Sequence, residues 1–382
     1  MKNFTPLVLD PHAVDFPEQI AACPAGAGVY ALRLAGSHTH IAWSASLPRR
    51  LQRLFLSYHK SQPAALAALR ASVEAIECWL TGSRLESSLL LYRLTREYYP
   101  EDYRKRLRLR IPWFLALTRD VFPRLTILNR VPRASELTIG PFVTRDAAQH
   151  YESEVLGLFQ IRRCTETLAP HPEHPGCIYG EMNQCLRPCQ CAVSVEEYAS
   201  EAQRAADFLG SNGKAALAAL SGARDRASEE MEFEQAAQIQ KRLERIQSAS
   251  KLRDEMVADV SGFSGVALTP ARGEKRFGLW PLVNGFWQEP VFAEFSAEQV
   301  AAKSLDQHLR EMLAGALASP CTESNRLEHL ALFSRWYFSS WRDGEWFPFR
   351  SGGHPDYRRL VREISKRAKS KEKEQPKPDR SG

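Results

Sequence analysis

Five of the eight cysteines lie close together, at positions 164, 177, 185, 189 and 191. Prolines and glycines separate them, and the segment holds too few apolar residues to bury a core of its own. Clustered cysteines in a protein of the reducing cytosol more often bind metal than form disulfides. Thiolates favour zinc or an iron–sulfur cluster, and His171 and His174 could also join a zinc site. The sequence therefore predicts a metal-binding module over residues 164–193.

The composition of the 382-residue chain is that of an ordinary soluble protein, with 44% apolar and 25% charged residues. The first residues include acids and no apolar run, which argues against a secretory signal. No window approaches the roughly 20 apolar residues of a membrane span. We therefore expect a cytoplasmic protein with no membrane partner, in which the isolated Cys23, Cys78 and Cys321 are buried or incidental thiols.

The formal net charge of +6 is unevenly distributed. Residues 84–133 carry a net charge of +7 and residues 357–382 a net charge of +6, so the remainder is negative. Two basic tracts on an acidic body favour a polyanionic partner, most simply DNA, although a solvated face and a disordered tail would look the same. The predicted DNA contacts are the densest basic run: Arg104, Lys105, Arg106, Arg108 and Arg110.

The order of the predicted elements suggests an α/β domain at the N-terminus. Residues 26–34 and 40–43 alternate as strands, and a helix is expected from Ser46. Residues 64–110 are predicted as two helical blocks separated by Gly82 and Ser83. Strands near 113–117, 124–128 and 140–143, followed by a helix at 146–160, form an α/β extension.

The second half of the chain begins with a helical region that starts at Ser194 and contains a hairpin of two amphipathic helices around Phe233. An α+β region follows, with a β-hairpin turning at Asn284–Gly285, helices near 297–317 and 324–340, and an aromatic stripe expected in the core. The predicted segments are 20–110, 111–163, 164–193, 194–250, 251–364 and a disordered basic tail at 365–382.

Several landmarks resemble, in order, the N-terminal half of the UvrC excinuclease family of bacterial nucleotide excision repair, over roughly residues 20–300. They are Gly28-Val29-Tyr30, Phe122-Pro-Arg-Leu125, Gly140-Pro-Phe142, Leu158-Phe-Gln-Ile-Arg-Arg-Cys164, the cysteine segment and Met231-Glu-Phe-Glu-Gln-Ala-Ala237. The resemblance implies a GIY-YIG nuclease-like domain. It also implies a [4Fe–4S] cluster on Cys164, Cys177, Cys185 and Cys189, with Zn²⁺ as the alternative. A UVR motif would bind a UvrB-like helicase through Met231, Phe233, Glu234 and Ala237.

The implied nuclease chemistry needs two tyrosines, an arginine and a glutamate that holds Mg²⁺ or Mn²⁺ as a Lewis acid. On this chain Tyr30 matches the first tyrosine, His40 replaces the second and Arg50 matches the arginine. Leu91 stands at the position of the glutamate and cannot ligate a metal that requires oxygen. Glu86 and Glu97 would point about 140° and 120° away around the helix.

The resulting expectation is a UvrC-like DNA-repair protein with a degenerate nuclease site. After Ser250 the sequence shows no acidic cluster with a histidine that would indicate a second nuclease. Two alternatives stay open: an active GIY-YIG endonuclease in which another carboxylate holds the metal, and a structural adaptor without DNA affinity.

Overall fold

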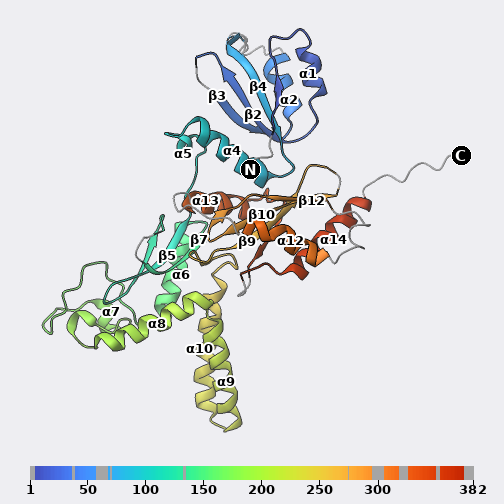
Figure 1. Ribbon diagram of the computed structural model, residues 1–382. Coiled ribbons are helices and arrows are strands. Elements are labelled where there is room, and N and C mark those ends of the chain that lie inside the picture. The colour runs from blue at the N-terminus through green and yellow to red at the C-terminus, as the bar shows by residue number, and fades with distance from the viewer. Residues whose placement is uncertain are drawn as a thin grey trace. The chain divides into compact units, whose positions relative to one another are not determined.

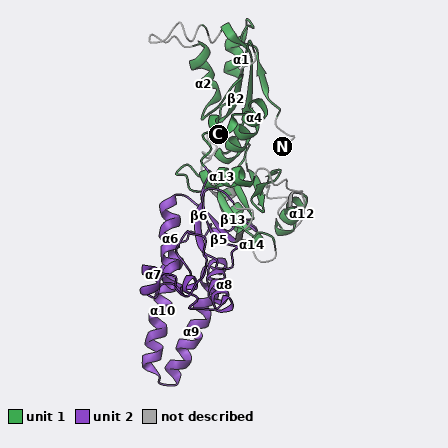
Figure 2. Ribbon diagram, turned by 90° about the vertical axis from the view of Figure 1, so that its left-hand side faces the viewer, with its two compact units in different colours: residues 1–110, 264–382 green, residues 111–263 purple. Residues whose placement is uncertain are grey.

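The computed structural model describes residues 5–36, 39–56, 68, 71–131, 135–273, 275–294, 305–317, 326–349 and 353–373. The chain forms two compact units (Figure 2). Unit 1 comprises residues 1–110 and 264–382, and unit 2 comprises residues 111–263. No helix in the described part of the chain is long and apolar enough to cross a membrane.

The N-terminal part of unit 1 is a four-stranded antiparallel sheet in the order β1-β4-β2-β3 (Figure 1). Its strands are β1 (Leu7–Leu9), β2 (Gly28–Leu34), β3 (Thr39–Ser44) and β4 (Val73–Leu80), and its helices are α1 (Phe16–Ala22), α2 (Leu47–Leu51), the π-helical turn η1 (Gln52–Leu56), α4 (Arg84–Tyr98) and α5 (Tyr103–Arg106). Because side chains alternate along a strand, Tyr30 packs with α1, α2 and η1 on one face. Val29 and Ala31 pack against α4 on the other.

The helix predicted before Gly82 is wrong for residues 73–80, which form strand β4, and residues 64–67 and 69–70 of that block lie outside the described residues. Val73, Ile76 and Leu80 have a spacing that also suits a helix, so hydrophobic periodicity alone does not identify the strand. β4 instead pairs with β2, from Gly28 opposite Leu80 to Arg33 opposite Ala75. Non-local pairing outweighs the local pattern here. The second helix is confirmed as α4, whose N-terminal cap is the Ser83 side chain accepting from the Glu86 N–H.

The C-terminal part of unit 1 is an antiparallel sheet flanked by three helices. The elements are β9 (Gly265–Pro270), β10 (Arg276–Val283), β11 (Phe286–Trp287), β12 (Val291–Glu294), β13 (Glu345–Pro348), α12 (Leu305–Leu317), α13 (Arg326–Tyr337) and α14 (Tyr357–Lys373). The predicted hairpin turn is confirmed at Asn284 and Gly285, which both have positive φ. The aromatic stripe is confirmed as core for Phe333 and Trp336, which are fully buried, whereas Tyr337, Phe338 and Trp341 are half-buried.

The prediction of a disordered tail from residue 365 is wrong for residues 365–373, which continue helix α14. Leu360 and Ile364 bury the apolar side of this helix. Arg367 then pairs with Glu363 one turn before it, at 2.9 Å, and with Glu345 at 3.6 Å. The charged composition of the tail suggested disorder, because composition alone does not show that a helix packs against, or pairs with, other parts of the chain. Residues 374–382 lie outside the described residues.

Unit 2 is built on a second antiparallel sheet, in the order β6-β5-β7-β8. Its elements are β5 (Trp113–Thr118), β6 (Leu125–Leu128), β7 (Ser135–Phe142), β8 (Ala258–Asp259), α6 (Arg145–Leu158), α7 (Ile178–Glu181), the 3-10 turn η2 (Pro188–Gln190), α8 (Val195–Ser211), α9 (Lys214–Glu229) and α10 (Phe233–Lys251). The predicted strands, the helix α6 and the helical hairpin α9–α10 are confirmed. Ser194 and Glu197 form a capping box that begins α8.

Candidate functional site

Tyr30, His40 and Arg50 come together on one face of the N-terminal sheet. Leu32 lies opposite His40 in the register of β2 and β3, so Tyr30 and His40 are diagonal neighbours on the same face. Their ring centroids are 6.1 Å apart. Arg50, on α2, donates from Nε to the Tyr30 hydroxyl at 3.1 Å. The structure therefore joins the three predicted catalytic residues.

The electrostatics of this cluster are those of a cationic site. Desolvation, followed by the nearby charge of Arg50, lowers the pKa of His40, which keeps the imidazole neutral near pH 7. The guanidinium of Arg50 has no acidic partner among the described residues. Tyr30 is fully buried and its hydroxyl accepts from Arg50, so His40 and Arg50 are the groups of this cluster that can meet a phosphate.

The carboxylate that a metal-dependent nuclease needs is missing from the described surroundings of this cluster. No described Asp or Glu hydrogen-bonds or pairs with Tyr30, His40 or Arg50. The neighbouring segments 37–38 and 57–70 contain no acidic residue at all. Leu91 packs with Val29 on the opposite face of the sheet.

The two glutamates considered as substitutes for that carboxylate have other positions. Glu86 is buried and accepts a hydrogen bond from the Gly82 N–H at 2.7 Å, at the start of its own helix. Burial raises the pKa of its carboxyl group to about 7, against the helix-terminal hydrogen bonds that lower it. Glu97 is exposed. Glu86 is thus committed to capping α4.

The predicted DNA-contacting side chains are all exposed or half-buried but differ in their engagement: Arg104, Lys105, Arg106, Arg108 and Arg110. Arg104 pairs with the buried carboxylate of Glu328 at 2.5 Å. Arg106 pairs with Asp102 at 2.9 Å and lies over the ring of Tyr99. The other three have no ion pair within the described chain, so their charges are free to meet a phosphate.

The four predicted ligand thiols are gathered in the loop that contains α7 and η2. Cys185 and Cys189 are buried, Cys164 is half-buried and Cys177 is exposed. Burial raises the pKa of the Cys185 thiol, a backbone hydrogen bond from Arg187 opposes this rise, and the nearby Cys164, Cys177 and Cys189 add to it. Within the described residues, no group of three or more His, Cys, Asp or Glu side chains is arranged to hold a metal ion. The donor types suit a thiolate centre.

The histidines of the loop contribute to its folding through Nδ1. His171 Nδ1 accepts from the Glu173 N–H, and His174 Nδ1 accepts from the Gly176 N–H at 3.0 Å. The fifth thiol, Cys191, is exposed and has a left-handed backbone conformation.

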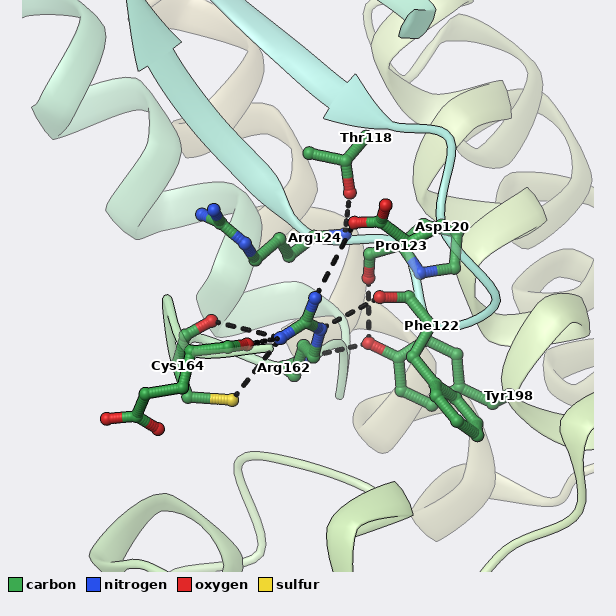
Figure 3. A network of polar contacts seen from close by, with 9 residues as sticks. Thr118, Asp120, Phe122, Pro123, Arg124, Arg162, Cys164 and Tyr198 are labelled. Carbon is green, nitrogen blue, oxygen red and sulfur yellow. Dashed lines mark hydrogen bonds and ion pairs between the residues drawn. The ribbon is translucent and has the colours of Figure 1, made fainter. Parts of the chain in front are cut away.

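Arg162 organises the base of this loop, and nothing in the sequence pattern marks it as special. Figure 3 shows its buried side chain reaching two segments. It donates to the Phe122 carbonyl at 2.8 Å, to the Glu166 carbonyl at 2.9 Å and towards Cys164 Sγ at 3.7 Å. Its backbone N–H donates to the Tyr198 hydroxyl at 2.8 Å. No local sequence signal distinguishes Arg162 from the adjacent Arg163.

The predicted partner-binding residues lie at or beside the tip of the α9–α10 hairpin, whose helices run side by side (Figure 1). Met231 and Phe233 are 74% and 67% exposed, which is unusual for large apolar side chains. Glu234 and Ala237 are exposed or half-buried. The hairpin therefore presents an apolar tip flanked by acids.

Comparison with known proteins shows that a large part of unit 2 is similar to one protein family. Residues 112–208 match the family model of the UvrC/Cho excinuclease middle domain. The chain is 28% identical to the UvrABC system protein C of Moorella thermoacetica over 70% of its own length and 43% of that relative. It is 31% identical to the protein of the same name from Alcanivorax borkumensis over 53% of its length and 34% of that relative. The chain thus spans less than half the length of these relatives.

No solved structure matches the chain. The similarity therefore rests on sequence. The matched family model covers strands β5, β6 and β7, the cysteine loop and most of helix α8, and strand β8 lies outside it. The chain is thus similar to these UvrABC system C proteins, and residues 112–208 are similar to the UvrC/Cho middle domain.

Proposed function

We propose that this chain is a UvrC-like protein of nucleotide excision repair that binds DNA and a UvrB-like helicase, and that its GIY-YIG site binds phosphate without efficient incision. The proposal about the nuclease site rests on one observation: Arg50 hydrogen-bonds Tyr30, and no described carboxylate pairs with either residue. An arginine can still hold a phosphate group in this arrangement, but no carboxylate among the described residues replaces the metal ligand. Lys105, Arg108 and Arg110, which have no ion pair among the described residues, support DNA binding.

The decisive experiment combines DNA binding with plasmid nicking by the purified protein. We expect duplex affinity to fall steeply with salt, because cations that contact phosphates release counterions. We also expect no nicking with Mg²⁺ or Mn²⁺. Nicking that Arg50→Ala abolishes would establish the endonuclease alternative. Absent or salt-insensitive DNA binding would instead contradict the proposed DNA contacts and favour the structural adaptor.

The hairpin tip is the proposed contact for the UvrB-like helicase. Replacing Phe233 by alanine should weaken the affinity for that helicase by about tenfold or more, since a large exposed aromatic is a typical interface anchor. Val143→Ala is the matched control, because Val143 is another exposed apolar residue of unit 2. Titration calorimetry would measure both. Equal affinities for the two variants would place the partner elsewhere.

We propose that Cys164, Cys177, Cys185 and Cys189 hold a [4Fe–4S] cluster, with Zn²⁺ as the alternative. The loop has few buried apolar side chains, so a metal centre would supply a cross-link that hydrophobic packing does not. Iron, sulfide and zinc contents of protein purified without oxygen distinguish the two centres.

A further inference from the structure

A cleft of 480 Å³ lies in unit 2 beside the cysteine loop. One wall is the turn between β5 and β6, residues 119–124, and the other is the segment that follows Cys164, residues 165–168. The buried Arg162 forms part of the lining between them. Neither the predicted DNA-contacting run nor the predicted ligand cysteines line this cleft.

The cleft is basic, and two of its arginines have no ion pair among the described residues. Three arginines line it, at positions 119, 124 and 162, against the two acids Asp120 and Glu166. The Asp120 carboxylate is directed to Arg162, at 3.6 Å. Arg119 is exposed and has no ion pair or hydrogen bond within the described residues. The Arg124 guanidinium likewise has no ion pair or hydrogen bond within the described residues. Its positive charge nevertheless acts to lower the pKa of Glu152.

Arg162 makes the geometry of the cleft rigid. Its guanidinium holds the first wall through the Phe122 carbonyl and the second through the carbonyls of Cys164 and Glu166. The hydroxyl of Tyr198, which accepts from the Arg162 N–H, also donates to the Pro123 carbonyl at 2.8 Å. Arg119 and Arg124, which have no ion pair among the described residues, therefore lie on a segment that these hydrogen bonds hold in place before a ligand binds. Such preorganisation lowers the entropic cost of binding.

We propose that this cleft binds a phosphate group of a nucleic acid, contacted by Arg119 and Arg124 and positioned by Arg162. Arginine forks match the geometry of phosphate oxygens, and the hydroxyls of Thr165 and Thr167 in the same lining offer further donors. The choice of DNA as the source of the phosphate rests on the proposed function. A free nucleotide carries the same chemistry. In either case the ligand would lie next to the segment that begins at Cys164.

The test uses the full chain with Arg119→Ala and Arg124→Ala combined. A labelled DNA duplex is titrated at several salt concentrations and followed by fluorescence anisotropy. The double variant should bind about tenfold more weakly, and the slope of log affinity against log salt should become less negative by about one to two. The control combines Lys241→Ala and Arg242→Ala on α10, which removes the same charge from exposed positions of the same unit outside the cleft.

If the double variant and the control lose the same DNA affinity, the loss reflects the lowered net charge and not the cleft. That result would overturn the proposal. An unchanged double variant would overturn it as well, while leaving DNA binding by the basic run intact. If the wild-type chain binds no DNA, the proposed function fails separately. Calorimetry with a mononucleotide then decides the cleft: binding that the double variant loses assigns the cleft to free nucleotides, and no binding rejects the site.

Discussion

Replacing Arg162 by alanine is expected to lower the free energy of unfolding of unit 2 by about 3–5 kcal/mol. The side chain is buried and satisfies the carbonyls of Phe122 and Glu166, with a longer contact to the carbonyl of Cys164. An alanine leaves these acceptors without a partner in a site that water enters poorly, and each buried unsatisfied group costs about 1–3 kcal/mol.

Amide hydrogen exchange measures this effect best, because a chain of two units does not have one well-defined free energy of unfolding. Protection should fall in α8 and in the cysteine loop while unit 1 keeps its protection. Arg119→Ala is the control, since this neighbouring arginine is exposed and should change stability by less than about 0.5 kcal/mol. Arg162→Lys should fall between the two, because an ammonium cannot donate in all the directions of a guanidinium. A loss below that of the control would show that the network is not stabilising.

Replacing Glu328 by glutamine is expected to lower the stability of unit 1 by about 2–4 kcal/mol near neutral pH. This buried carboxylate of α13 accepts from the hydroxyls of Tyr92 and Tyr103, at 2.5 and 2.7 Å, and from Arg104 Nε at 2.7 Å. A glutamine would turn an amide donor towards some of these donors. Arg104 is mostly exposed, so the two tyrosine hydrogen bonds should matter more than the ion pair.

The pH dependence gives this prediction a second test. Burial alone would raise the pKa of Glu328, but the hydrogen bonds from Tyr92, Tyr103 and Arg104 outweigh it and lower the pKa below the ordinary 4.5. A carboxyl group with a lowered folded-state pKa stabilises the fold above pH 4.5, and this contribution is lost as the pH falls through the lowered value. The stability gap between the wild type and Glu328→Gln should therefore narrow in acid.

Thermal unfolding at about pH 7 and at about pH 3 measures the gap between these two proteins, since the two values bracket the titration of a carboxyl group. Glu363→Gln is the matched control, since Glu363 pairs with Arg367 only one turn away on α14 and should contribute less than about 1 kcal/mol. A gap that is the same at both pH values would contradict the assignment of the stabilisation to the ionised carboxylate.

The elements predicted correctly are those with local signals. Ser194 and Glu197 begin α8 by their own side chains, and Asn284 and Gly285 adopt the positive φ that a tight hairpin requires. Strand β4 was missed because its partner, β2, lies far away in the sequence. The helix at residues 365–373 was missed because Leu360 and Ile364 anchor it against the sheet of unit 1. Both errors arise from contacts that no local window contains.

By itself, the sequence determined which chemical groups this protein has. It provides clustered thiols, an apolar hairpin tip, and a leucine at position 91 with no acid between residues 57 and 70. Only the tertiary structure decided which face of the sheet Leu91 occupies, and that Arg162 is buried while Arg119 is exposed without an ion pair among the described residues. The physical reason is that the burial and pairing of a side chain depend on segments brought together by folding, whereas its chemical type does not.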